Sequence, residues 1–294
     1  MQYSPRGQGA TPAVYGLIDQ AMRRGDFAQA MRLAEAALDA GQRHPVLFNL
    51  RAQSRKRAGR MEEALADLER ARAFDAKSAV LASEIAECLN GLGRHEEALA
   101  AAKDALALDR TLGVAWYQKA MAHAAMIDLD AARKAFREAL RRDPDLADAH
   151  AQLASLEAEQ GNYDAARRHV EEALHRNPKH PIALVAKVST ALAGRRLAEA
   201  ETTLQDLLAD RALSPPLRAA AAIQLGDLRD LQGQPDKAFD AYREARRTWS
   251  SFFGPVVARS AGEMGCERAL RVASFVEKRP AKSKERPRHD AQRG

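Results

Sequence analysis

Apolar residues recur three and four positions apart along most of this chain, with polar residues between them. This spacing predicts a succession of amphipathic α-helices. The pattern also repeats every 34 residues, most clearly from Leu112 to Pro178. At this period Ala falls at positions 30, 64, 98, 132, 166 and 200. A register kept over six copies predicts six consecutive units of the same kind.

Each unit divides into two predicted helices joined by a short turn. The turn position holds Gly in four copies, whereas Ile127 and Arg195 stand there in the other two. Gly adopts backbone conformations that branched residues resist, so it suits a sharp turn. Ala recurs where helices must cross closely, because a longer side chain would separate them. One helix pair cannot bury its apolar face alone, so the pairs are expected to stack into a solenoid.

The period and the residue types resemble the tetratricopeptide repeat. The copy from Gly113 to Asp145 carries the characteristic residues in order: Trp116, Ala120, Ala132, Phe136, Ala139 and Pro144. A seventh copy follows after a slip of four residues and includes Leu225, Gly226, Gly233, Ala238, Tyr242 and Ala245. The resemblance implies an all-α protein, a right-handed α-solenoid of about seven helix pairs with a C-terminal capping helix.

The expected domain organisation follows from this register. Residues 1–10 are rich in Gly and Gln and predict a flexible tail, and residues 11–250 form the solenoid. The repeats begin near residues 11, 45, 79, 113, 147, 181 and 219. Apolar residues return at helical spacing in 251–277, which predicts a helix that caps the last repeat. Residues 278–294 are basic and lack apolar periodicity, so they are expected to be disordered.

Charge and cysteine content narrow the possible functions. The net charge is +6, and residues 277–294 supply +4 of it through seven basic and three acidic residues. The repeats are therefore nearly balanced, and no specific nucleic-acid surface is expected. Cys88 and Cys266 have neither metal-ligand nor disulfide spacing. With no predicted secretion signal or membrane span, we expect a cytoplasmic protein.

No residue pattern in the chain indicates catalysis. There is no phosphate-binding loop of the Gly-rich type, and the histidines lack the spacing of metal ligands. His123 and His150 fall at core positions of their repeats, where a buried imidazole with a hydrogen-bond partner is the expected role. The sequence therefore predicts a non-enzymatic protein without a cofactor or a bound metal.

The resemblance implies a concave groove lined by the first helix of each repeat. The candidate lining residues are Tyr15, Asn49, Gln53, Lys56, Arg57, Glu87, Asn90, Tyr117 and Met121. Four of them, from Asn49 to Arg57, form a donor-rich patch suited to an extended acidic peptide or a C-terminal carboxylate. An ordinary solvated surface is the alternative. Arg55 replaces the usual aromatic residue or Leu and suggests local solvent access. We expect a scaffold that binds a protein or peptide in this groove.

A second hypothesis comes from the end of the repeats. Residues 225–253 resemble the corresponding region of bacterial proteins that join such repeats to a sulfotransferase domain, including the spacing of Ala238, Phe239 and Tyr242. The chain ends before the strand and phosphosulfate-binding loop found in those relatives. Under this alternative, it is the substrate-recruiting N-terminal region of a sulfotransferase whose catalytic domain is absent.

Overall fold

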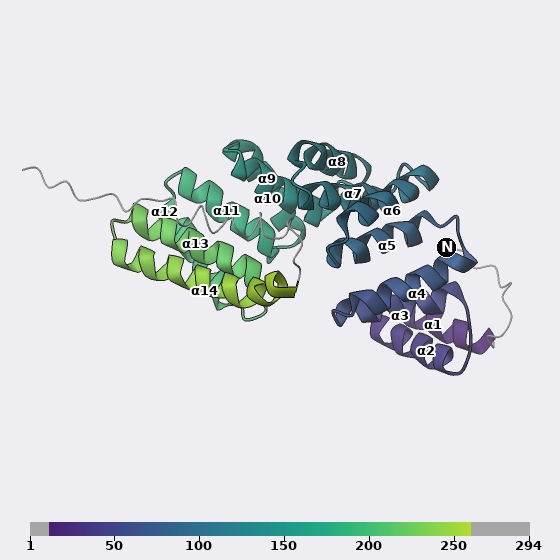
Figure 1. Ribbon diagram of the computed structural model, residues 1–294. Helices are drawn as coiled ribbons and strands as arrows, with labels where there is room; N and C mark the ends of the chain where they lie inside the picture. The colour runs from purple at the N-terminus through teal and green to yellow at the C-terminus, as the bar shows by residue number, and fades with distance from the viewer. Residues whose placement is uncertain (1–11, 260–294) are drawn as a thin grey trace, which may run out of the picture. The chain divides into compact units, whose positions relative to one another are not determined.

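The computed structural model describes residues 12–259, and this part of the chain consists of fourteen α-helices and no strand (Figure 1). The predicted tails at 1–10 and 278–294 lie outside the described residues. In chain order, the helices are α1 Pro12–Arg23, α2 Phe27–Asp39, α3 Pro45–Arg57, α4 Met61–Phe74, α5 Ala79–Gly91, α6 His95–Leu108, α7 Gly113–Ala125, α8 Leu129–Arg142, α9 Ala147–Glu159, α10 Tyr163–Arg176, α11 Pro181–Ala193, α12 Leu197–Ala209, α13 Pro215–Leu231 and α14 Pro235–Arg259.

Neighbouring helices pack as consecutive pairs. The contacts join α1 to α2, α3 to α4, α5 to α6, α7 to α8, α11 to α12 and α13 to α14. Each of the odd-numbered helices is the first of its pair. The chain divides into two compact units, one reaching Leu156 and including Glu171–Pro178, the other formed by Glu157–Val170 and the chain from Lys179. The all-α class and the pairing predicted from the sequence are confirmed.

The recurrent alanines are buried inside the pairs. In the first unit, Ala30, Ala64, Ala98 and Ala132 have no exposed surface, and the same holds for Ala200 in the second. Larger side chains fill the remaining space, among them Leu68, Phe136 and Leu204, which are also fully buried. This combination of small and large residues allows the helices to pack closely.

The turns inside the pairs share one backbone conformation. Gly93 has a φ of +76° in the turn between α5 and α6. Its N–H donates to the carbonyl of Asn90 at 3.1 Å, and the next N–H, of Arg94, donates to that of Leu89 at 2.9 Å. This arrangement is a Schellman motif, which needs a left-handed residue after the helix. Ile127 adopts it with a φ of 65° and Arg195 with a φ of 55°. The turn is therefore kept even where the residue disfavours it.

The last pair differs from the expected boundaries. Its first helix, α13, begins at Pro215 rather than near 219, because proline is compatible with the first turn of a helix. Its second helix, α14, continues through Gly254 and Pro255 to Arg259. A break near residue 250 is thus not seen, and residues 260–277 of the predicted capping helix lie outside the described part. No helix within residues 12–259 is long and apolar enough to cross a membrane.

Candidate partner-binding face on the first helices

The candidate residues lie on four first helices of the first unit. Tyr15 belongs to α1 and Met121 to α7. The remaining candidates are Asn49, Gln53, Lys56 and Arg57 on α3, Glu87 and Asn90 on α5, and Tyr117 on α7. We call the surface formed by these residues of α3, α5 and α7 the first-helix face.

An ion pair and a buried carboxyl connect α3 to α5. Lys56 Nζ lies 2.7 Å from Glu87 Oε2, and the lysine side chain is only 9% exposed. One turn before Glu87, the carboxyl of Glu84 lies near the side chains of Asn49 and Gln53, and Gln53 Nε2 donates to Asn49 Oδ1 at 3.5 Å. Burial raises the pKa of Glu84, although Lys56 and the two amides act in the opposite direction. Two of the four donors predicted for a ligand, Gln53 and Lys56, are thus engaged within the chain.

Amide hydrogen bonds continue the connection from α5 to α7. Asn90 Nδ2 donates to Gln118 Oε1 at 3.1 Å and to the Gln118 backbone carbonyl at 3.0 Å. The Gln118 side chain is itself buried. On the same helix, burial raises the pKa of the Tyr117 hydroxyl, which lies near Gln152 of α9. The helices α3, α5 and α7 are therefore joined in sequence by polar side chains.

These connecting residues share one position in the repeat, which sequence reasoning missed. Glu84, Gln118 and Gln152 are separated by 34 residues each. After the four-residue slip the same position holds Gln224 of α13, whose Nε2 donates to Ser189 Oγ of α11 at 2.6 Å. The 34-residue register aligns these four residues, so the sequence contains the pattern that identifies them.

Three candidates lie apart from the connected residues. The ring of Tyr15 packs against that of His44, with centroids 4.9 Å apart. Arg57 is exposed at the end of α3, and Met121 packs against the apolar core around α7 and α8. The structure thus pairs Asn49 with Gln53 and Lys56 with Glu87, and it links Asn90 to Gln118.

The groups beneath this face do not form a catalytic arrangement. Cys88 is fully buried, and burial raises the pKa of its thiol to about 11, so it is protonated at neutral pH. His150 is buried as well, and its Nε2 lies 3.1 Å from the carbonyl of Pro144. Within the described residues, no three His, Cys, Asp or Glu side chains are grouped to hold a metal ion.

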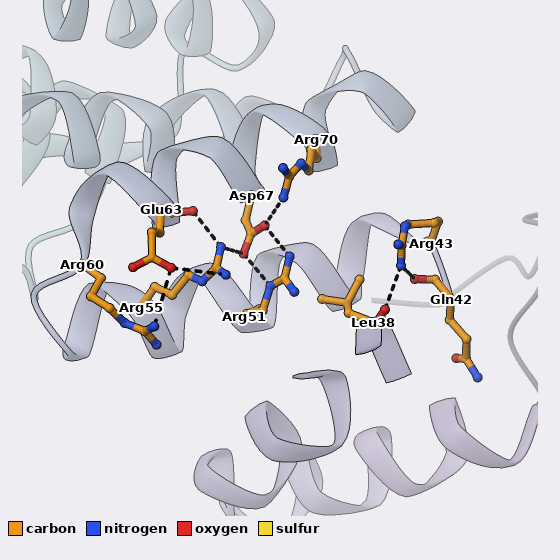
Figure 2. A network of polar contacts seen from close by, with 9 residues as sticks. All are labelled: Leu38, Gln42, Arg43, Arg51, Arg55, Arg60, Glu63, Asp67 and Arg70. Atoms are coloured by element: carbon orange, nitrogen blue, oxygen red, sulfur yellow. Dashed lines mark hydrogen bonds and ion pairs between the residues drawn. The ribbon is translucent and has the colours of Figure 1, made fainter. Parts of the chain in front are cut away.

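Arg55 is not open to solvent as the sequence suggested. Its side chain is 16% exposed, and its Nη1 lies 2.7 Å from Oδ2 of Asp67 on α4. Figure 2 shows Asp67 between Arg51, Arg55 and Arg70. The unusual arginine is compensated by an equally unusual buried aspartate, a partner that the helical pattern of α3 alone does not reveal.

Comparison with known proteins places this architecture in a family. One family model described as the tetratricopeptide repeat matches residues 15–79 and 117–181, and a second with the same description matches residues 157–223. Together the matches span more than half of the chain. No curated protein matches the chain.

Several solved structures have a similar fold. Cut9–Hcn1, a hetero-tetramer of the APC/C, superimposes with a TM-score of 0.62 and 15% identity over 91% of this chain and 53% of that one. PilW, a type IV pilus biogenesis factor, gives 0.55 and 22% over 68% and 94%. A tetratricopeptide repeat protein from Parabacteroides merdae gives 0.53 and 19% over 81% and 94%. Taken with the 34-residue register and the paired helices, the family matches show that this chain belongs to the tetratricopeptide repeat family.

Proposed function

We propose that the chain is a non-enzymatic scaffold that binds an extended segment of a partner protein along the first-helix face. The observation that carries this proposal is the network of polar side chains that crosses α3, α5 and α7. Side chains fixed by such contacts lose little further freedom when a ligand binds, which favours affinity. Asn49 and Gln53 remain partly exposed, and amides can both donate to and accept from a peptide backbone.

The charges on this face suggest the chemistry of the partner. Lys56 is neutralised by Glu87, so it is a poor clamp for a carboxylate. Arg57 is the exposed cation of the donor-rich patch. We therefore propose that a partner segment places one acidic group at Arg57 and is otherwise held through its backbone by the amides.

The solved relatives support an assembly role at the level of fold. The Cut9–Hcn1 structure is that of a hetero-tetramer, so a fold of this class occurs there within a protein assembly. We also propose a cytoplasmic location for this chain. The sulfotransferase hypothesis remains an alternative, and the coding sequence immediately downstream tests it. A strand followed by a phosphosulfate-binding loop there would favour this alternative over the scaffold.

The test of the proposed function is affinity capture of partners by the wild type and by the variant Asn49→Ala/Lys56→Glu. We expect the variant to lose partners that the wild type and the control variant Arg142→Ala both capture. Arg142 lies at the end of α8 and is exposed, so the control changes charge away from the face. The double exchange Lys56→Glu/Glu87→Lys retains the ion pair and separates misfolding from loss of recognition. Identical partner sets for all variants would exclude this face.

A further inference from the structure

A pocket between α2, α3 and α4 is lined largely by arginine. It has a volume of about 490 Å³, and its lining consists of Leu38, Asp39, Arg43, Phe48, Arg51 and Arg70. On α3, the helical periodicity places Arg51 on a different side from Asn49, Gln53 and Lys56. The pocket is therefore separate from the first-helix face, and the proposed function does not use it.

A buried carboxylate holds two of the lining arginines in place. Arg51 donates from Nε and Nη2 to the two oxygens of Asp67, both at 2.7 Å. Arg70 donates from Nη1 to Asp67 Oδ1 at 3.1 Å. Arg55, which is not in the lining, donates from Nη1 to Asp67 Oδ2 at 2.7 Å. Asp67 has no exposed surface. Figure 2 shows this convergence of three guanidinium groups on one aspartate.

The third arginine is held by backbone carbonyls. Arg43 Nη1 donates to the carbonyl of Leu38 at 2.8 Å and to that of Gln42 at 2.9 Å. The Arg51 guanidinium lies over the ring of Phe48, 5.9 Å from its centroid. All three groups are thus positioned in the absence of a ligand. Their hydrogen bonds leave Nη1 of Arg51 and the Nη2 of Arg43 and Arg70 to bind an anion.

The charge of the lining favours an anion. Arg43, Arg51 and Arg70 face a single lining carboxylate, Asp39. The buried Asp67 is shared by Arg51, Arg55 and Arg70, and Arg55 also pairs with Glu63 at 3.4 Å. The hydrogen bond to Asp67 raises the pKa of the Arg51 guanidinium, and Asp39 and Glu35, of which Glu35 lies outside the lining, raise it further. A phosphate monoester carries up to two negative charges and three oxygens, so it can use donors from all three arginines. A carboxylate has only two oxygens for them.

We propose that this pocket binds a phosphate monoester presented by a phosphorylated side chain of a partner peptide. The volume exceeds what a phosphate group alone needs, so it leaves room for the flanking residues of a peptide. Asp39 at the rim can accept a hydrogen bond from a backbone N–H or a basic side chain of that peptide. Arginine clusters are suited to this kind of recognition because their donors lie in fixed planes.

The experiment is calorimetry with four probes at one ionic strength: a phosphoserine peptide with a neighbouring lysine, its unphosphorylated form, inorganic phosphate and adenosine monophosphate. We expect the phosphopeptide to bind most tightly. Arg43→Gln and Arg70→Gln should each weaken it about tenfold, as expected for loss of one charge-assisted hydrogen bond. Neither residue is buried, so both variants should fold. The matched control Arg142→Gln should stay within about twofold.

Several results would overturn the proposal. Equal binding of the two peptides would exclude phosphate recognition, and equal weakening by Arg142→Gln would show that only overall charge matters. Inorganic phosphate or the mononucleotide binding as tightly as the phosphopeptide would exclude a peptide as the ligand. The variant Asn49→Ala/Lys56→Glu should retain phosphopeptide binding, so failure of the proposed function and failure of this inference can be told apart.

Discussion

The second and third helix pairs have the same backbone arrangement, but three of their inward positions hold charged residues in one pair and apolar residues in the other. In α3 and α4, the inward positions hold Arg51, Arg55 and Asp67, joined by ion pairs of 2.7 Å. In α5 and α6, the residues 34 positions later are apolar. They are Ile85, Leu89 and Ala101, all buried. Both pairs bury other apolar residues, but at these three positions one pair has ion pairs and the other has apolar contacts.

The difference shows which positions determine the architecture. Both pairs keep a fully buried Ala, at 64 and 98, and a left-handed Gly in the turn, at 59 and 93. Ion pairs in an interior lose their hydration, and replacement by apolar residues is often neutral or stabilising. The charges of α3 and α4 are thus not needed for the fold, which is consistent with their holding a ligand site in position.

The largest expected effect is that of Asp67→Ala. Removing the shared carboxylate leaves the largely buried Arg51 without an ion-pair partner and leaves Arg55 with only Glu63. Breaking a buried ion pair in this way typically costs about 3–5 kcal/mol. Urea denaturation of the purified chain measures this loss. Arg70→Ala is the matched control. Its side chain is 58% exposed, so it should change the free energy of unfolding far less.

The same comparison predicts a rescue. The triple variant Arg51→Ile/Arg55→Leu/Asp67→Ala gives α3 and α4 the interior of α5 and α6. We expect it to recover the stability lost in Asp67→Ala, while losing the phosphopeptide binding proposed above. A triple variant as unstable as Asp67→Ala would mean that the two interiors are not interchangeable.

A smaller effect is expected in the turn of the next pair. Ile127 has a φ of 65° where the two preceding pairs have Gly. Ile127→Gly should raise the free energy of unfolding by about 1 kcal/mol, because it removes strain from a β-branched residue. Gly93→Ala is the reverse test and should lower it by a similar amount. A side chain at Gly93 would meet nothing within 4 Å, so only the backbone is affected.

The smallest expected effect is a pH-dependent change in stability when Glu84, between the second and third helix pairs, is replaced. Burial raises the pKa of Glu84, so the folded protein binds its proton more tightly than the unfolded chain does. This contribution to stability is complete below the unfolded pKa of about 4.3 and is lost as the pH rises through the folded pKa. Glu84→Gln should therefore be more stable relative to wild type at pH 8 than at pH 4.

Thermal melts at the two pH values measure this difference. Lys56 and Glu87 surround the same carboxyl and are unchanged in the variant. Glu87→Gln is a suitable control, since the Glu87 side chain is 46% exposed. A pH-independent effect of Glu84→Gln would contradict the assigned direction of the pKa shift.

The helices could be predicted from the sequence because their determinants repeat. Ala64 and Ala98 follow the period, and so do the turn positions, including Ile127, whose left-handed conformation the register implies. The structural reason is that each repeat contacts mainly its neighbours, so local spacing carries most of the information.

The polar contacts could not be predicted from helix spacing alone. Arg55 and Asp67 lie on different helices, and each looks like a surface residue until the two are seen together. The spacing within α5 does not distinguish Glu84 from Glu87, because the environment of Glu84 depends on Asn49 and Gln53 in the preceding pair. Pairing between helices, rather than periodicity within one, determines these sites.

The alkylation rate of the buried Cys88 can measure local opening of the protein. Its thiol has no exposed surface and a pKa of about 11, so an alkylating reagent can react only after α5 separates from its neighbours. With Cys266 replaced by Ser, the rate of labelling would therefore report how often this segment opens under native conditions. A bound partner that spans α3 and α5 would slow that rate. The alkylation rate of the Cys88 sulfur would therefore report whether the first-helix face is occupied.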